Sequence, residues 1–244
     1  MAQSVIDWLL GSRREPRVTI GGREMPVAIR RHPRARRLTM RLAPDGSEVR
    51  ITLPAWGRTI DAMVFIDSRR SWLETQVAAI PAAAPPVPAG TIAYRGERLA
   101  IEWQPGRPRK PRVEANRVVL GGASETIVPR LRRWLEGEAL RLLEADLADY
   151  CARASVEPPN LRLSRAQRRW GSCSGKGCIR INWRLVQAPD AVRRSVVAHE
   201  VAHLVHFDHS PDFHRLLGEL YGADIAQADA WLRREGRSLY AAFG

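Results

Sequence analysis

VVAHEVAHLVHFDHSPDFH, residues 196–214, holds five of the six histidines of the chain. Apolar residues flank His199 and His203, which predicts a largely buried helix that begins near residues 189–190. Residues four apart lie one turn apart on the same face of a helix, so these two imidazoles share a face. The pattern His199-Glu200-Val201-Ala202-His203 therefore predicts one helical turn that carries two imidazoles and a carboxyl group.

This H-E-x-x-H pattern predicts a metal site. Two imidazoles can bind one tetrahedral ion at about 2.0–2.1 Å each. Glu200 is then free to take a proton from a metal-bound water, whose pKa zinc lowers to about 7. Without a metal, the same side chains would have to form a hydrogen-bonded core cluster, because buried polar groups need partners. We expect one zinc per chain, although imidazole also suits manganese, nickel and cobalt.

His209 is the expected third ligand, because it stands ten positions after His199, as in H-E-x-x-H-x-x-G-x-x-H proteases. For it to reach the metal, the helix must end after His203 and the chain must turn back. Ser210 and Pro211 are suited to the cap and first position of a following helix, which supports that turn.

Other residues near this pattern have weaker claims. Glu219, on the following helix, is the alternative third ligand, and His214 is expected to face substrate. His206 lies seven residues after His199, about 10.5 Å along a helix, which is too far to share one ion. Since no methionine follows Met63, the Met-turn of metzincins is absent.

The preceding residues predict short strands and helices. Residues 17–54 alternate in the β manner around the turns 21–22 and 44–46, which predicts a meander. A helix is expected over 59–77, strands over 91–103 and 117–120, and one long amphipathic helix over 125–155. Residues 80–89 are rich in proline and alanine and predict a linker or loop. No internal repeat is apparent.

A strand is expected at 161–164, followed by a hairpin over 172–183. Its second strand, 178–183, could be the sheet edge that holds a peptide as an added strand. Arg169 and Arg180 could then neutralise an oxyanion or a phosphate. Cys173 and Cys178 are expected to pack as small side chains, since one C-x4-C pair is a weak metal signal.

The sequence thus predicts an α+β protein. Residues 1–121 form a β-rich N-terminal region, and residues 122–244 form a zincin-like catalytic region with the H-E-x-x-H helix and a small antiparallel sheet. The first residues do not predict a secretory signal and no apolar run is long enough to span a membrane, so we expect a cytoplasmic protein.

Charge is distributed unevenly along the chain. The net charge is +13, and only Lys110 and Lys176 are lysines among the 39 basic residues. Residues 1–120 carry 21 basic and 11 acidic residues, whereas residues 121–244 carry 18 and 15. A basic half indicates an anionic partner such as nucleic acid, or else an arginine-rich solvated surface.

Together these segments resemble the YgjP-like metal-dependent hydrolases, relatives of the SprT-like and WLM zinc peptidases. The segments that carry the resemblance are Arg169–Ser174, Ile181–Leu185, Ala188–Pro189, Val196–Leu204 and His209–Phe213. The resemblance covers most of the chain and implies metal on His199, His203 and His209, with Glu200 catalytic. His214 departs from it, because the family usually has tryptophan there.

Three functions follow as hypotheses. The first is a zinc metallopeptidase that cleaves peptide bonds with water activated by Glu200. The second is a nucleoside triphosphate (UTP) pyrophosphatase on the same metal site, an activity also attributed to the family. The third is a nucleic-acid-associated binding module with a structural zinc, against which an open coordination position argues.

Overall fold

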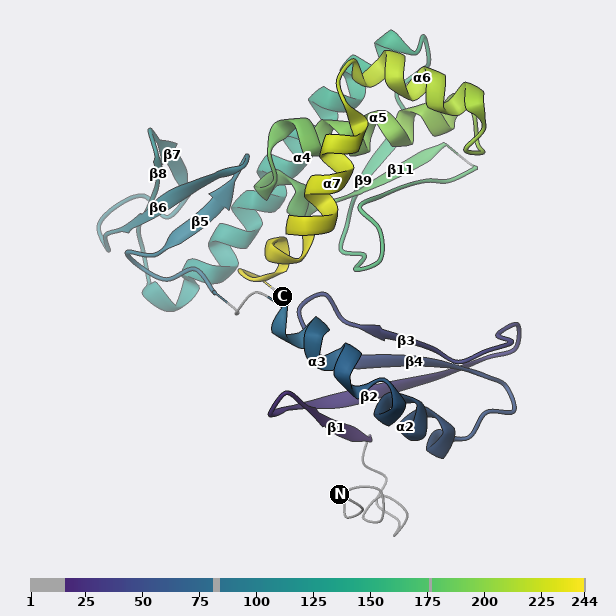
Figure 1. The fold of residues 1–244 in the computed structure, drawn as a ribbon. Helices are drawn as coiled ribbons and strands as arrows, with labels where there is room; N and C mark the ends of the chain where they lie inside the picture. Colours follow the sequence, from purple (N-terminus) through teal and green to yellow (C-terminus); the bar gives the residue numbers. More distant parts are fainter. Residues whose placement is uncertain (1–15, 81–83, 176, 244) are drawn as a thin grey trace. The chain divides into compact units, whose positions relative to one another are not determined.

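The computed structural model describes residues 16–80, 84–175 and 177–243. It divides the chain into two compact units, Met1–Ala82 and Ala83–Gly244, each with its own hydrophobic core (Figure 1). Both units combine helices with small sheets, which confirms the α+β class. The units divide earlier than the expected boundary near residue 122, because strands between residues 91 and 120 share the core of the second unit.

The first unit is a four-stranded sheet with helices against one face (Figure 1). Its strands are β1 (Arg17–Ile20), β2 (Arg23–His32), β3 (Thr39–Leu42) and β4 (Val49–Pro54). Their order is β1-β2-β4-β3, and β2 and β4 run parallel, so the expected meander is wrong. Alternation along β4 places Val49, Ile51 and Leu53 in the core and leaves Arg50 and Thr52 on the other face.

Two helices, α2 (Thr59–Ser68) and α3 (Arg70–Ala78), replace the single helix expected over 59–77. The chain leaves helical geometry at Arg69, whose φ and ψ are −115° and 17°. Ile66 of α2 and Leu73 of α3 both lie in the core against the sheet.

The second unit begins with a sheet that repeats the topology of the first. Its strands are β5 (Thr91–Tyr94), β6 (Glu97–Trp103), β7 (Arg112–Glu114) and β8 (Arg117–Leu120). The order is β5-β6-β8-β7, and β6 and β8 are parallel, as β2 and β4 are. Both sheets open with a two-residue turn at positive φ, at Gly21-Gly22 and at Arg95-Gly96. The repeat escaped the sequence analysis because such short strands share only their alternation.

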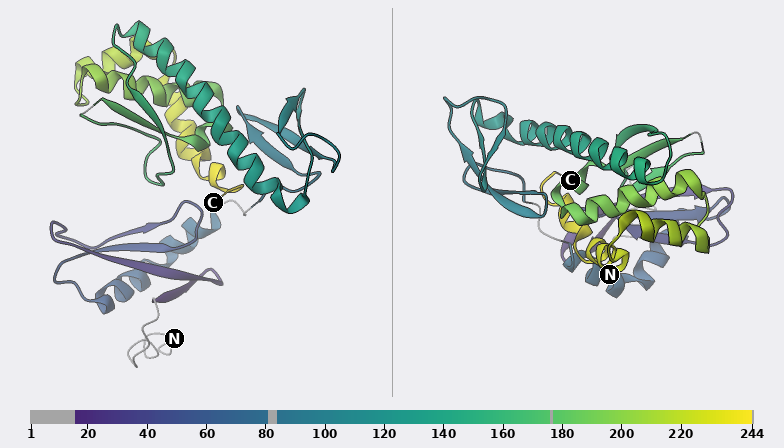
Figure 2. Two further views of the ribbon diagram at one scale, coloured as in Figure 1. Left: turned by 180° about the vertical axis from the view of Figure 1, so that it is seen from behind. Right: turned by 90° about the horizontal axis from the view of Figure 1, so that it is seen from above.

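Helix α4 (Ile127–Arg153) is the central helix of the second unit and confirms the expected long helix. Figure 2 shows the β5–β8 sheet near the start of this helix and the remaining helices along its second half. Ile101 and Leu120 from the sheet pack in one core with Leu131 and Leu135 of the helix. This shared core explains why the strands belong with the C-terminal unit.

A three-stranded sheet and three helices complete the unit. The strands are β9 (Asn160–Ser164), β10 (Gly171–Cys173) and β11 (Cys178–Asn182); the helices are α5 (Asp190–Val205), α6 (Pro211–Tyr221) and α7 (Ile225–Glu235). Short 3-10 helices are η1 (Ser124–Thr126), η2 (Trp183–Gln187) and η3 (Gly236–Tyr240). The strand order is β10-β11-β9, and β9 runs parallel to β11, so the sheet is mixed and not wholly antiparallel as expected.

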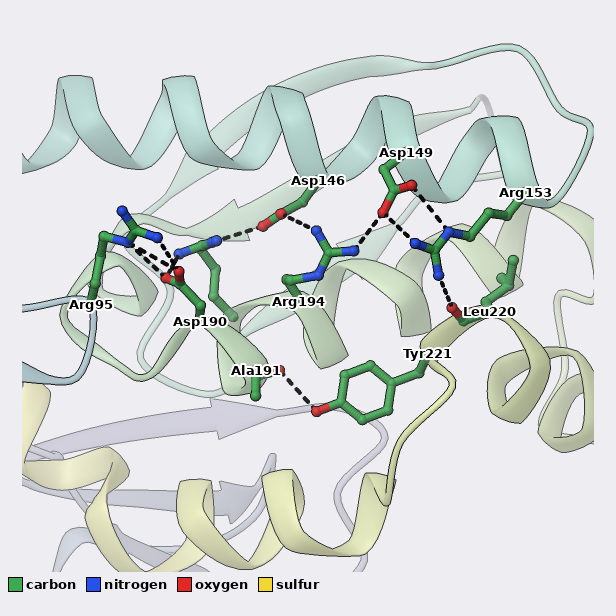
Figure 3. A network of polar contacts seen from close by, with 10 residues as sticks. Arg95, Asp146, Asp149, Arg153, Asp190, Ala191, Arg194, Leu220 and Tyr221 are labelled. Atoms are coloured by element: carbon green, nitrogen blue, oxygen red, sulfur yellow. Dashed lines mark hydrogen bonds and ion pairs between the residues drawn. The ribbon is translucent and has the colours of Figure 1, made fainter.

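Buried ion pairs tie α5 to α4 (Figure 3). The Asp146 carboxylate of α4 accepts hydrogen bonds from Arg193 Nε at 2.7 Å and from Arg194 Nη1 at 2.9 Å, both on α5. Arg193 also pairs with Asp190, and Arg194 with Asp149. Arg193 and Asp146 are only 3% and 4% exposed, so α5 is anchored by charges that cannot separate without leaving one of them buried alone.

Candidate metal centre

Helix α5 carries the H-E-x-x-H pattern, as the sequence predicts. The imidazole centroids of His199 and His203 lie 4.8 Å apart, one helical turn from each other. Glu200 projects to a different side of the helix, toward β10, and is 6% exposed. One helix therefore separates two candidate ligands from one buried carboxyl group.

The chain leaves the helix at His206, after His203, as the return of His209 to the metal requires. His206 has extended backbone, and its carbonyl oxygen accepts a hydrogen bond of 3.2 Å from Nδ1 of His203. This bond places the proton of His203 on Nδ1 and leaves the Nε2 lone pair free to bind a metal. His206 thus contributes its backbone to the site.

The turn after α5 brings His209 back to the helix. The Ser210 hydroxyl caps α6 by accepting a hydrogen bond from the Phe213 N–H, as expected. Nε2 of His209 lies 3.4 Å from Nε2 of His199. A ligand nitrogen of each of the three histidines lies within 4.8 Å of the others.

This geometry fits a tetrahedral ion. Two nitrogens bound at about 2.05 Å with a tetrahedral angle between them lie about 3.3 Å apart. The observed 3.4 Å between His199 and His209 matches that spacing. Three imidazoles also leave the fourth position of such an ion open, as in catalytic zinc sites.

Phe213, from the first turn of α6, forms an apolar floor under the three imidazoles. Its buried ring lies 4.5–5.0 Å, centroid to centroid, from the rings of His199, His203 and His209. Burial, followed by the charges of the other histidines, lowers the pKa of His199 to about 4. Burial also lowers the pKa of His203. His199 is therefore neutral at pH 7, the form that binds metal.

Glu200 occupies a space that Gly171 leaves open. A Cβ atom added to Gly171 would lie 2.3 Å from Glu200 Oε1, so glycine is required for this approach. Burial raises the pKa of Glu200 to about 7, while the charge of Arg169 and a hydrogen bond from the Cys173 backbone act in the opposite direction. Strand β10 and α5 together fix the carboxyl group.

The structure places the remaining expected residues differently. Arg169 is exposed and close enough to influence Glu200. Arg180 pairs with Ser172, one residue out of phase with Gly171, so it lies on the sheet face opposite Glu200. His214 is exposed, with its ring 6.3 Å from that of His209. Glu219 pairs with Arg215 and is not among the described residues that gather as ligands.

The expectation that residues 178–183 form an edge strand is wrong. The strand β11 lies between β10 and β9, and β10 is the edge strand beside α5. The error arose because β9 pairs with β11 from the far side, a long-range contact that the local pattern does not encode. All three cysteines are free, and Cys173 and Cys178 are half-buried in the hairpin.

Two residues of the site carried no assigned function in the sequence analysis. Phe213 was only part of a familiar segment, although its position three residues after the Ser210 cap places it on the inner face of the first turn. Gly171 lay only within the segment Arg169–Ser174 that carries the family resemblance. An apolar rim was also missed: Phe207 is 64% exposed, with its ring 6.2 Å from that of His203 and beside the hairpin turn at Gly175.

Comparison with known proteins identifies a family of metallopeptidases. The family model for the YgjP-like metallopeptidase domain matches residues 36–235. Among solved structures, the chain is similar to the crystal structure of the metallopeptidase zymogen abylysin of Pyrococcus abyssi, with 19% identity and a TM-score of 0.34. That match covers 41% of this chain and 96% of the other. A search of the curated proteins found no match. Along the described residues, no helix has the length and apolar character needed to cross a membrane.

Proposed function

Because the chain belongs to the YgjP-like metallopeptidase family, we propose that it is a zinc-dependent peptidase whose active centre lies on α5. The observation that carries this proposal is the 3.4 Å spacing of the His199 and His209 nitrogens, which is the spacing of two ligands on one tetrahedral ion. His203, oriented by its bond to the His206 carbonyl, completes the set of ligands.

The residues of the site divide the work of hydrolysis. An ion held by the three histidines would supply a Lewis acid and lower the pKa of water to about 7. Glu200 accepts the proton of the attacking water and delivers it to the leaving amine, as a general base and then a general acid. Gly171 and the Cys173 N–H hold that carboxyl group in place. The charge of Arg169 acts on Glu200, and this guanidinium group can balance negative charge developing on the substrate.

The surroundings of the site favour a peptide substrate. Phe207 is 64% exposed, with its ring 6.2 Å from that of His203, and it offers apolar contact to substrate side chains. By contrast, a cavity of about 640 Å³ that gathers Arg109, Lys110 and Arg133 lies along the first half of α4, and no histidine lines it. The triphosphatase alternative would need such cations at the metal.

Metal analysis tests the site. We expect one zinc per chain in the purified protein and its loss in His209→Ala, measured by elemental mass spectrometry. His214→Ala is the matched control, because it removes an exposed neighbouring imidazole that belongs to no ligand set. Equal zinc in all three proteins would refute the three-histidine centre.

Activity tests the role of Glu200. The zinc-loaded protein is expected to cleave members of a peptide library, and Glu200→Gln is expected to bind zinc and lose that cleavage. Release of pyrophosphate from UTP without peptide cleavage would establish the triphosphatase instead. A zinc-bound protein that hydrolyses neither substrate would favour the binding module with a structural zinc.

A further inference from the structure

The first unit carries an uninterrupted basic segment. Residues 25–44 contain six arginines and no acidic residue. Among the described residues, no ion pair involves Arg30, Arg34, Arg36, Arg37 or Arg41, whereas most other arginines near the sheet have a carboxylate partner. The positive charge of this segment is therefore open to an external anion.

Strand register gathers part of this charge on the sheet face that α2 and α3 leave uncovered. Arg30 pairs with Thr52, and Thr52 with Thr39, so these three side chains share a face. Two residues further along, Arg41 pairs with Arg50 on the same face. The core residues of β4 point to the opposite face, toward the helices.

The remaining arginines lie at the end of the sheet where β2 and β4 finish, together with an exposed aromatic ring. Because β2 and β4 run parallel and His32 pairs with Pro54, the turns that follow the two strands leave from the same end of the sheet. The first turn leads into Arg34, Arg36 and Arg37, all exposed. The second turn, closed by a 3.0 Å bond from the Gly57 N–H to the Pro54 carbonyl, presents Trp56 with 75% of its surface exposed.

Arg31 holds the second turn in position. Its Nε donates to the Gly57 carbonyl at 3.0 Å, and its Nη2 donates to the Thr59 hydroxyl at 3.1 Å. The Trp56 turn is thereby fixed to the end of β2. An indole that is 75% exposed offers a flat face on which a planar ligand can stack.

We propose that this end of the sheet and its open face bind single-stranded nucleic acid. The surface is defined by Trp56, Arg30, Arg34, Arg36, Arg37 and Arg41. The guanidinium groups neutralise successive phosphates, and the Trp56 indole stacks on a base. Stacking requires an unpaired base, which the interior of a duplex does not offer, and polyglutamate carries no aromatic ring on which the indole could stack. A sheet face with an aromatic ring and flanking cations is a known solution for single strands.

Fluorescence anisotropy with the full chain and labelled twelve-nucleotide dT and U strands tests this proposal. Both strands are expected to bind with an affinity that falls as salt rises, and the tighter of the two identifies DNA or RNA as the preferred source. Trp56→Ala is expected to weaken binding about tenfold, the effect of removing one stacked base, and Trp56→Phe to retain most of it. Arg34→Gln/Arg37→Gln is expected to reduce the salt slope by about 0.7 for each phosphate that is no longer neutralised.

Matched variants separate this surface from general charge. Trp72→Ala removes a tryptophan that is 45% exposed on α3, and Arg23→Gln/Arg69→Gln removes the same charge elsewhere in the unit. Both are expected to bind like the unaltered protein, with thermal unfolding confirming that every variant is folded. The proposal is overturned by absence of binding at low salt, by equal effects of Trp56→Ala and Trp72→Ala, or by equal competition from a duplex or from polyglutamate. None of these readouts depends on zinc or on peptidase activity.

Discussion

Replacing Gly171 by alanine is expected to disarm Glu200 without removing the metal. An added Cβ atom would lie 2.3 Å from Glu200 Oε1, 2.7 Å from its Cγ and 2.8 Å from its Cδ. Ordinary van der Waals contacts begin near 3.4 Å, so the carboxyl group must move by about 1 Å. The histidines lie on another side of α5 and can keep their positions.

A displacement of about 1 Å at a catalytic group can lower a rate about 100-fold. We therefore expect Gly171→Ala to retain one zinc per chain and to cleave peptides about 100-fold more slowly. The loss should appear in kcat, since Glu200 acts on the proton of water and not on substrate binding. Glu200→Gln sets the floor for this comparison.

Gly175→Ala is the matched control, because a Cβ there would meet only Phe207, at 4.0 Å. Initial rates, zinc content and unfolding temperature are measured for the two glycine variants and the unaltered protein. If Gly171→Ala cleaves peptides within threefold of the unaltered rate, the carboxyl group does not need the position seen between β10 and α5. If Gly171→Ala loses zinc instead, the position of the Glu200 carboxyl group affects the metal-binding histidines, which would contradict their independence on another side of α5.

Three further outcomes are expected from the packing of α5. Asp146→Ala leaves Arg193 buried with a weaker partner, and it should lower the free energy of unfolding by about 3 kcal/mol, or the unfolding temperature by about 6–12 °C. Asp149→Ala, at a half-exposed site, should lower the free energy of unfolding by less than about 1 kcal/mol. Equal shifts of the unfolding temperature in calorimetry would contradict the anchoring of α5 by Asp146. The hydrogen bond from Arg194 lowers the pKa of Asp149, so the ionised carboxylate stabilises the fold above about pH 4, and this stabilisation is lost as pH falls through the folded-state pKa. The difference in unfolding temperature between the unaltered protein and Asp149→Asn should therefore shrink between pH 6 and pH 3. A constant difference would exclude this linkage. Zinc at 100 times its Kd should stabilise the unaltered protein by about 2.7 kcal/mol and His209→Ala by much less in thermal unfolding, and an equal gain would place the ion elsewhere.

The helices and the gathering of the histidines could be predicted because both are local. His199 and His203 are related by one helical turn, and the cap at Ser210 with Pro211 after it announces the return of the chain. These features depend on residues within about fifteen positions of one another.

The strand pairings could not be predicted, because they join distant segments. Nothing in residues 160–164 states that they pair in parallel with 178–182, yet that pairing moves β11 to the centre and makes β10 the edge. The contact of Gly171 with Glu200 likewise joins a hairpin to a helix. The turns that carry Arg34 and Trp56 leave neighbouring strands because β2 pairs directly with β4, whereas in a meander β3 would separate these strands.

The placement of the three ligands bears on whether a bound ion is catalytic or structural. A structural zinc site is closed by four protein ligands, usually including cysteine. Here the gathered groups are three histidines, and the buried carboxyl group of Glu200 is turned toward Gly171, away from the ligand face of the helix. His209 is exposed and the apolar ring of Phe207 lies 6.2 Å from that of His203, so an ion held by the three histidines would be accessible to a substrate. A zinc-loaded protein should therefore bind a hydroxamate, a bidentate zinc ligand, and lose this binding in His209→Ala; calorimetric titration that shows no hydroxamate binding to the loaded protein would indicate a closed, structural site.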